Sequence, residues 1–150
     1  MSNSYLELTR MIERLHRRYL DVVRAELNRL GIKDINAVQA LLLNNIGSDE
    51  IIIRELIERG YYQGSNVSYN IKKLVDHGYI EQERDPHDKR SVRIRLTERS
   101  RDLCAKLVEM EERNAKELDS LGVSEAEVET VGQTLRRLER LWSDFIHYRP

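Results

Sequence analysis

Between residues 79 and 96 the spacing of apolar residues changes from a helical period to strict alternation. The run Ser91-Val92-Arg93-Ile94-Arg95-Leu96 would direct its apolar members to a core and Ser91, Arg93 and Arg95 outward, as in a half-buried strand. Residues 79–84 predict a second strand, and the polar segment 85–90 between the two has the composition of a hairpin tip. A basic hairpin is therefore predicted near the middle of a chain that is otherwise helical.

Apolar residues elsewhere recur at helical spacing, in segments that mostly end at glycines. Asn36 with Gln39, and Ser124 with Glu127, have the spacing of capping boxes, and Thr97 is placed to cap another helix. Helices are expected at about 4–30, 37–46, 53–59, 65–77, 97–121 and 124–148. The order of four helices, a hairpin and two helices predicts a mainly α fold with a small β-wing, a winged helix-turn-helix with long terminal helices.

Bulk composition excludes several classes of protein. The chain has 150 residues, enough for one domain, and no apolar run approaches the ~20 residues of a membrane span. The N-terminus lacks the pattern of a signal peptide, and Cys104 is the single cysteine, so no disulfide framework is expected. A cytoplasmic protein is the expectation.

Signatures of catalysis are missing from the sequence. There is no phosphate-binding loop, nucleophile elbow or dinucleotide fingerprint, and the four histidines are scattered. His87 near Asp85 and Asp88 is a weak metal cluster, because a cationic hairpin tip makes a poor metal site. We therefore expect neither an enzyme nor a cofactor nor a metal.

Positive charge is concentrated in one region, although the net charge is only -1. Residues 84–101 contain seven arginines and lysines against three acidic residues, whereas acidic residues gather in 109–129. Phosphates respond to the local field rather than to the sum of charges. The hairpin and its flanks therefore favour a nucleic-acid partner.

The helix expected at 65–77 directs Val67, Ile71 and Leu74 inward. Its outward or flanking residues are polar and include no acid before Asp76, and asparagine can pair with adenine in the major groove. These candidate DNA-binding residues are Ser65, Asn66, Ser68, Tyr69, Asn70, Lys72 and Lys73. The same pattern also fits an ordinary polar helix surface.

On the hairpin, Lys89 and Arg90 would place a cation in the minor groove, where the negative potential of DNA is strongest. Arg93 and Arg95, two residues apart on one strand face, would neutralise neighbouring phosphates. The alternative is a solvated run of charges.

The stretch Asp85-Pro86-His87-Asp88-Lys89-Arg90-Ser91-Val92-Arg93-Ile94-Arg95-Leu96-Thr97 resembles the wing signature of the MarR family of regulators. Residues 35–39 resemble the start of that family's second helix. Ser65-Asn66-Val67-Ser68-Tyr69-Asn70-Ile71-Lys72-Lys73-Leu74-Val75, with Gly78-Tyr79-Ile80, is similar to its recognition helix and strand entry, and in particular to the LdtR-type subgroup. One departure is Ser100, where the family usually has glycine.

The resemblance implies a homodimer that binds double-stranded DNA at a pseudo-palindromic operator. It implies that Arg90 contacts DNA, that Asp88 orients Arg90, and that a small aromatic or phenolic effector modulates binding. Residues 1–150 would form one MarR-like domain, with about 36–97 as the DNA-binding part and 1–31 and 98–150 as dimerisation helices.

The terminal helices independently predict self-association. Each carries a long apolar stripe that a small winged domain cannot cover along ~40 Å, so a second copy is expected to bury much of it. The alternative is that both helices fold back onto their own domain.

Two further features have both a functional and a structural interpretation. His16 and Tyr19, one turn apart near the apolar face of the first helix, would donate hydrogen bonds to an effector, or else simply pack at the interface. Cys104 has Arg101 and Lys106 nearby, but its apolar neighbours favour a buried small hydrophobe over a redox sensor.

A different class of function stays open: a winged helix that serves as a protein–protein interaction module without sequence-specific DNA binding.

Overall fold

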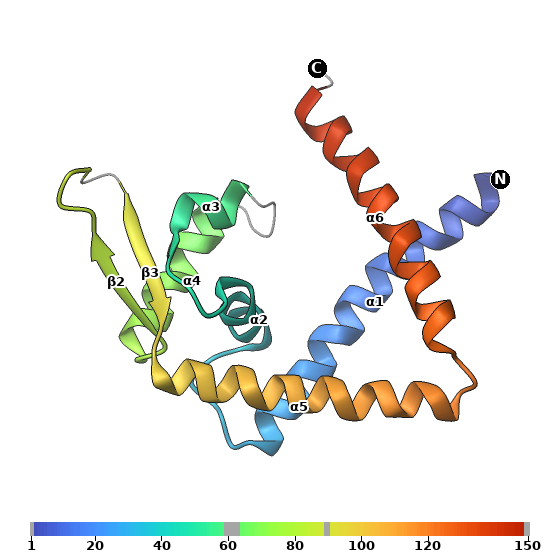
Figure 1. The fold of residues 1–150 in the computed structure, drawn as a ribbon, viewed down its shortest axis with the longest axis horizontal. Helices are drawn as coiled ribbons and strands as arrows, with labels where there is room; N and C mark the ends of the chain where they lie inside the picture. The colour runs from blue at the N-terminus through green and yellow to red at the C-terminus, as the bar shows by residue number, and fades with distance from the viewer. Residues whose placement is uncertain (1, 59–63, 89–90, 149–150) are drawn as a thin grey trace. The chain divides into compact units, whose positions relative to one another are not determined.

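The computed structural model describes residues 2–58, 64–88 and 91–148 (Figure 1). Its elements are α1 (Ser2–Arg29), α2 (Ala37–Ile46), β1 (Ile51–Ile52), α3 (Ile53–Glu58), α4 (Gly64–Asp76), β2 (Ile80–Arg84), β3 (Val92–Leu96), α5 (Glu98–Ser120) and α6 (Glu125–Tyr148). The predicted fold class, mainly α with a small β-wing, is confirmed.

The chain divides into two compact units, residues 1–108 and 109–150, with the boundary inside α5. This division reflects contacts within the single chain and does not test the predicted functional parts. That residues 36–97 bind DNA and that residues 1–31 and 98–150 form the dimer stays a prediction.

Side-chain caps fix the helix starts, as the sequence predicts. At α2 the Asn36 side chain accepts from the Gln39 backbone N–H at 2.8 Å, and the Gln39 side chain accepts from the Asn36 N–H at 3.0 Å. At α6 the Glu127 N–H donates to the Ser124 hydroxyl at 3.1 Å. Each pair satisfies backbone donors that have no partner inside the helix, so local sequence suffices to place these boundaries.

The sheet has three antiparallel strands in the order β1-β3-β2. Strands β2 and β3 form the predicted hairpin, with Glu81 opposite Arg95 and Gln82 opposite Ile94. Strand β1 was not predicted: it has two residues, and it pairs Ile51 with Ile94. Its pairing places the start of α3 beside the wing.

The core of the first unit lies where α2, α3, α4 and the sheet meet. Leu42, Leu43, Leu56, Val67 and Leu74 are fully buried there. Val23 and Leu27 near the end of α1 and Leu103 and Leu107 of α5 are also buried. Because α4 is packed along its apolar stripe, its opposite face is held rigidly toward solvent.

Large apolar side chains stay exposed on the long helices. On α1 they are Tyr5, Leu6, Met11, Leu15, Tyr19 and Val22; in the second unit, Leu118, Leu121, Val128, Val131, Leu135, Leu141, Phe145 and Ile146. Such contiguous stripes are costly in water and mark surfaces that bury against a partner. None of the helices, over the described residues, is both long and apolar enough for a bilayer.

Candidate nucleic-acid interface

The outer face of α4 carries exposed polar and cationic side chains. Asn66, Ser68, Tyr69, Lys72 and Lys73 are exposed, as predicted. Tyr69 is 61% exposed, and the Lys73 ammonium lies 5.7 Å from the centre of its ring. The backbone of Ser65 lies in α4, but its side chain falls outside what the structure describes. An exposed helix face with cations and no acid before Asp76 is compatible with a phosphate-lined groove.

Asn70 differs from the other polar residues of α4, because it is only half exposed. Its Oδ1 accepts a hydrogen bond from the Gln39 Nε2 at 3.2 Å, which ties α4 to the start of α2. The Asn70 amide therefore already has a structural partner, whereas that of Asn66 faces solvent. Of the two asparagines, Asn66 is better placed to read a base edge.

Asp85 organises the base of the hairpin tip. Its carboxylate accepts from the backbone N–H of His87 at 2.8 Å and of Asp88 at 3.4 Å, and it also pairs with Arg93 at 3.3 Å. These partners, the His87 N–H first, lower the pKa of Asp85. The Asp85 carboxylate thus takes the place of the backbone carbonyl that accepts the hydrogen bond in an ordinary turn.

Lys89 and Arg90, the two predicted minor-groove residues, lie outside the described residues. Asp88 next to them is exposed, and its Oδ2 accepts from the Ser91 hydroxyl at 3.0 Å. Ser91 was predicted to face outward, and this was wrong: it is buried, and its N–H also donates to the Asp88 carbonyl at 3.0 Å.

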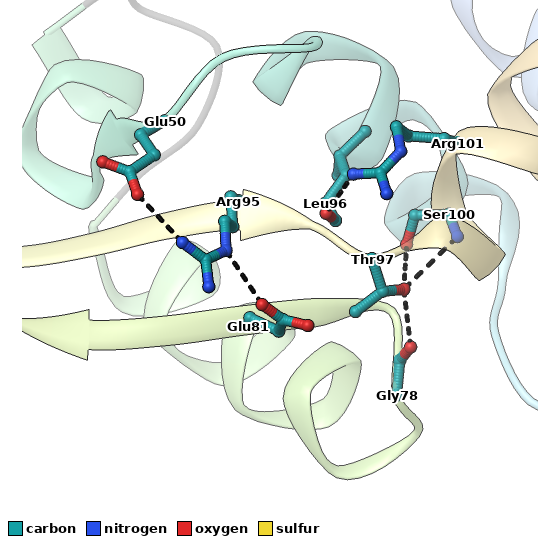
Figure 2. A network of polar contacts seen from close by, with 8 residues as sticks. All are labelled: Glu50, Gly78, Glu81, Arg95, Leu96, Thr97, Ser100 and Arg101. Atoms are coloured by element: carbon teal, nitrogen blue, oxygen red, sulfur yellow. Dashed lines mark hydrogen bonds and ion pairs between the residues drawn. The ribbon is translucent and has the colours of Figure 1, made fainter.

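Arg93 and Arg95 lie on the outer face of the sheet, as their alternation predicts, but both are ion-paired within the chain. The Arg95 Nε donates to Glu81 at 2.8 Å, and its Nη1 donates to Glu50 at 3.1 Å (Figure 2). Arg93 pairs with Asp85 and lies 3.9 Å from Glu50. Phosphate would therefore compete with carboxylates for either arginine.

The root of the wing is joined to α5 by short polar contacts (Figure 2). The Thr97 hydroxyl donates to the Gly78 carbonyl at 2.8 Å, and the Ser100 N–H lies 3.4 Å from the Thr97 hydroxyl, which confirms Thr97 as the helix cap. Ser100 is fully buried, and its own hydroxyl donates to the Tyr79 carbonyl. Serine at this position thus adds a hydrogen bond that glycine could not make.

A second polar cluster joins three segments at the same place. The Tyr79 hydroxyl donates to Asp34 at 2.9 Å, and Arg99 donates to Asp34 at 2.9 Å and to the His77 carbonyl at 2.7 Å. The Arg99 guanidinium also lies 4.3 Å from the centre of the Tyr79 ring. The α1–α2 loop, the end of α4 and the start of α5 are therefore held in one arrangement.

Tyr79→Phe is expected to change the alkaline stability of the protein. Burial, together with the hydrogen bond to Asp34, raises the pKa of Tyr79 to about 12 from 10.0. The neutral phenol is favoured in the folded state, so its contribution is complete below pH 10 and is lost as pH rises toward 12, on the order of 2 kcal/mol. The unfolding free energies of wild type and variant, measured in urea from pH 8 to 12, should therefore converge; a constant difference would contradict this.

The remaining candidate residues lie apart from α4 and the wing. His16 and Tyr19 are both exposed on α1, and an effector role for them stays a prediction. Cys104 is half-buried in α5, and burial raises the pKa of its thiol, which disfavours the reactive thiolate.

Sequence reasoning missed the partners of the wing and of α4. Glu50 and Glu81 were not singled out, and Gln39 was predicted only as a capping residue, although each holds a candidate DNA-binding side chain. Glu81 was within reach of prediction, because a hairpin register places it opposite Arg95. Glu50 was not, since it depends on the unpredicted strand β1.

Comparison with known proteins agrees with this geometry. The Winged helix DNA-binding domain family matches residues 35–100. The Exopolysaccharide II synthesis transcriptional activator ExpG of Rhizobium meliloti (strain 1021) is 43% identical over 145 residues, which cover 97% of this chain and 75% of the relative. The HTH-type transcriptional regulator SarZ of Staphylococcus aureus (strain MRSA252) is 26% identical over 117 residues, 77% of each chain.

Solved structures give the same fold. A mutant MarR from E. coli complexed with operator DNA superimposes with a TM-score of 0.74 at 23% identity, covering 91% of this chain and 96% of that one. Streptococcus pneumoniae FabT in complex with DNA superimposes at 0.75 and 20% identity, covering 94% and 99%. The 43% identical relative and the matched domain show that the chain belongs to the winged helix transcriptional regulators rather than to an enzyme family, and the solved structures show that it has the fold of MarR.

Proposed function

We propose that this regulator binds double-stranded DNA sequence-specifically, as a homodimer on a pseudo-palindromic operator. The observation that carries the proposal is the solvent-facing side of α4, which is polar, cationic and free of acid before Asp76, in the same compact unit as the basic hairpin. A helix with such a face fits the major groove, and the hairpin tip with Lys89 and Arg90 would enter the flanking minor groove.

The interface residues have distinct proposed roles. Asn66 and Tyr69 would contact base edges, and Lys72, Lys73, Ser65 and Ser68 would bind phosphates or neighbouring bases. Asp88 would orient Arg90. Two proteins of this fold that were solved with DNA, one of them with operator DNA, support the assignment.

Dimerisation is proposed from the exposed apolar faces of α1 and α6. Two-fold symmetry would present two copies of α4 to half-sites about one helical turn, ~34 Å, apart. A pseudo-palindromic operator follows from that symmetry.

The proposal also covers the effector, the subgroup of regulators and the location in the cell. A small aromatic or phenolic compound would bind near His16 and Tyr19 and modulate DNA affinity. The sequence of α4 supports membership of the LdtR-like subgroup. A regulator that acts on chromosomal DNA would work in the cytoplasm.

Selection of bound sequences from a random duplex pool tests DNA binding directly. The expected result is an enriched motif with two-fold symmetry, bound with a steeply negative slope of log affinity against log salt concentration. Failure to enrich any motif, together with an affinity that salt does not change, would overturn the proposal and favour the interaction module. Repeating the selection with a library of phenolic compounds tests the effector.

Asn66→Ala is expected to relax base preference at one position in each half-site. Loss of a bidentate contact to adenine costs about 1–3 kcal/mol on the matching base and almost nothing on others. Affinities for the selected duplex and for single-base variants, measured at one salt concentration, show the effect; Asn28→Ala, an exposed asparagine of α1, is the control. Equal losses on every duplex would mean that Asn66 contacts only the backbone of DNA.

The alternative function, a winged-helix protein interaction module, has no observation of its own in its favour. The charges on α4 would suit an acidic protein surface as well as phosphate, so the salt and selection experiments separate the two.

A further inference from the structure

One row of side chains crosses the outer face of the sheet from strand to strand. Glu81 of β2 lies opposite Arg95 of β3, and Glu50, immediately before β1, reaches Arg95 from the other side. Figure 2 shows the Arg95 guanidinium between the two carboxylates, with hydrogen bonds of 2.8 Å to Glu81 and 3.1 Å to Glu50. One residue of β2 and one residue just before β1 thus both hold the same wing cation.

The three side chains are each about half exposed, so the cluster is open to a competing anion. The hydrogen bonds that Arg95 donates to Glu81 and Glu50 raise the pKa of Arg95, so the arginine stays charged. Solvent-exposed ion pairs of this kind are weak, so phosphate can replace a carboxylate. The replaced carboxylates nevertheless remain nearby and repel the incoming phosphate.

We propose that Glu50 and Glu81 form a carboxylate clamp that competes with DNA phosphate for Arg95, and that the clamp lowers the affinity of the wing for duplex. The inference rests on the proposed DNA-binding function. Arg95 contributes little to phosphate neutralisation while it is clamped, because its charge is already matched within the chain. Glu50 and Glu81 are therefore affinity-setting residues, although neither contacts DNA.

Glu83 provides a matched control on the same strand and the same face. It lies two residues beyond Glu81, opposite Arg93, and is equally acidic and exposed. In the part of the chain that the structure describes, no ion pair of Glu83 is recorded. Glu81→Gln and Glu83→Gln therefore change the net charge by the same amount at neighbouring positions, and the former alone loosens the clamp.

The test measures binding to a short mixed-sequence duplex over a series of salt concentrations. Glu81→Gln and Glu50→Gln are each expected to tighten binding about three- to tenfold at 0.1 M salt and to steepen the slope of log affinity against log salt by up to about 0.9. Glu83→Gln should leave the slope unchanged and tighten binding about twofold or less, because its effect is a screened long-range field. Thermal melting of each variant checks that the exposed substitutions leave the fold intact.

A double-mutant cycle identifies Arg95 as the residue released. Arg95→Ala is expected to weaken binding only slightly in the wild-type background and more strongly in the Glu81→Gln background. In the Arg95→Ala background, Glu81→Gln should then behave like Glu83→Gln.

Two results would overturn the clamp. Equal effects of Glu81→Gln and Glu83→Gln on duplex affinity would indicate that net charge alone matters. No effect of either variant would mean that Arg95 does not contact phosphate. Both differ from failure of the proposed function, in which the wild-type protein itself shows no salt-dependent binding to duplex.

Discussion

A Leu138→Asp variant is expected to sediment as a monomer. It should bind the selected operator at least about a hundredfold more weakly than wild type, because a monomer cannot bind two half-sites at once. Leu138 is half-buried on α6, on the same stripe as the exposed Leu135, Leu141 and Phe145. A carboxylate at the centre of an apolar interface would be desolvated without a partner. Analytical ultracentrifugation and operator titration measure the two effects.

Gln133→Asp is the matched control for this variant, because Gln133 lies on the opposite, exposed side of α6 and receives the same new charge. It should remain dimeric. A dimeric Leu138→Asp protein would place the interface on another surface, and a monomer with unchanged operator affinity would show that pairing is not needed for binding.

Arg90→Ala is expected to weaken operator binding by about tenfold to a hundredfold, and to reduce the salt slope by about one unit if Arg90 neutralises a phosphate. A cation inserted in the minor groove gains from the strong negative potential there. Arg93→Ala should have a smaller effect, since Arg93 is already paired with Asp85 and lies near Glu50.

Arg10→Ala removes the same charge from the exposed side of α1, away from the wing, and should change operator affinity by less than about twofold because salt screens distant charges. If Arg90→Ala binds operator as tightly as Arg10→Ala does, the wing has no part in DNA binding.

Local signals in the sequence were sufficient for most of the fold. The caps at Asn36 and Ser124 act within three residues, so they could be identified without knowledge of the tertiary structure. Strand β1 could not, because Ile51 and Ile52 become a strand only by pairing with β3, about 40 residues later. Ser91 was misplaced because alternation assigns it to the outer face, whereas its hydroxyl and its N–H are both bonded to Asp88 and its side chain is buried.

The sequence predicted which side chains of the candidate interface face solvent, but not which residues of the chain they are bonded to. Periodicity placed Asn66 and Tyr69 outward correctly, because burial of the opposite stripe of α4 decides their direction. Nothing in the spacing indicated that Asn70 is bound to Gln39 or that Arg95 is bound to Glu50, since those contacts join segments 31 and 45 residues apart.

Gln39 limits which residue can occupy the third position of α2. Its Oε1 accepts a hydrogen bond from the Asn36 N–H, while its Nε2 donates one to Asn70. The oxygen and the nitrogen of one side-chain amide therefore both have partners. Glutamate would complete a capping box equally well, but it has no donor for Asn70 and would bring a negative charge next to α4, the helix proposed to face phosphate. Exchange of this amide for an acid would thus preserve the start of α2 and loosen α4 at its proposed DNA-binding face, a substitution that is conservative for one helix and disruptive for the other.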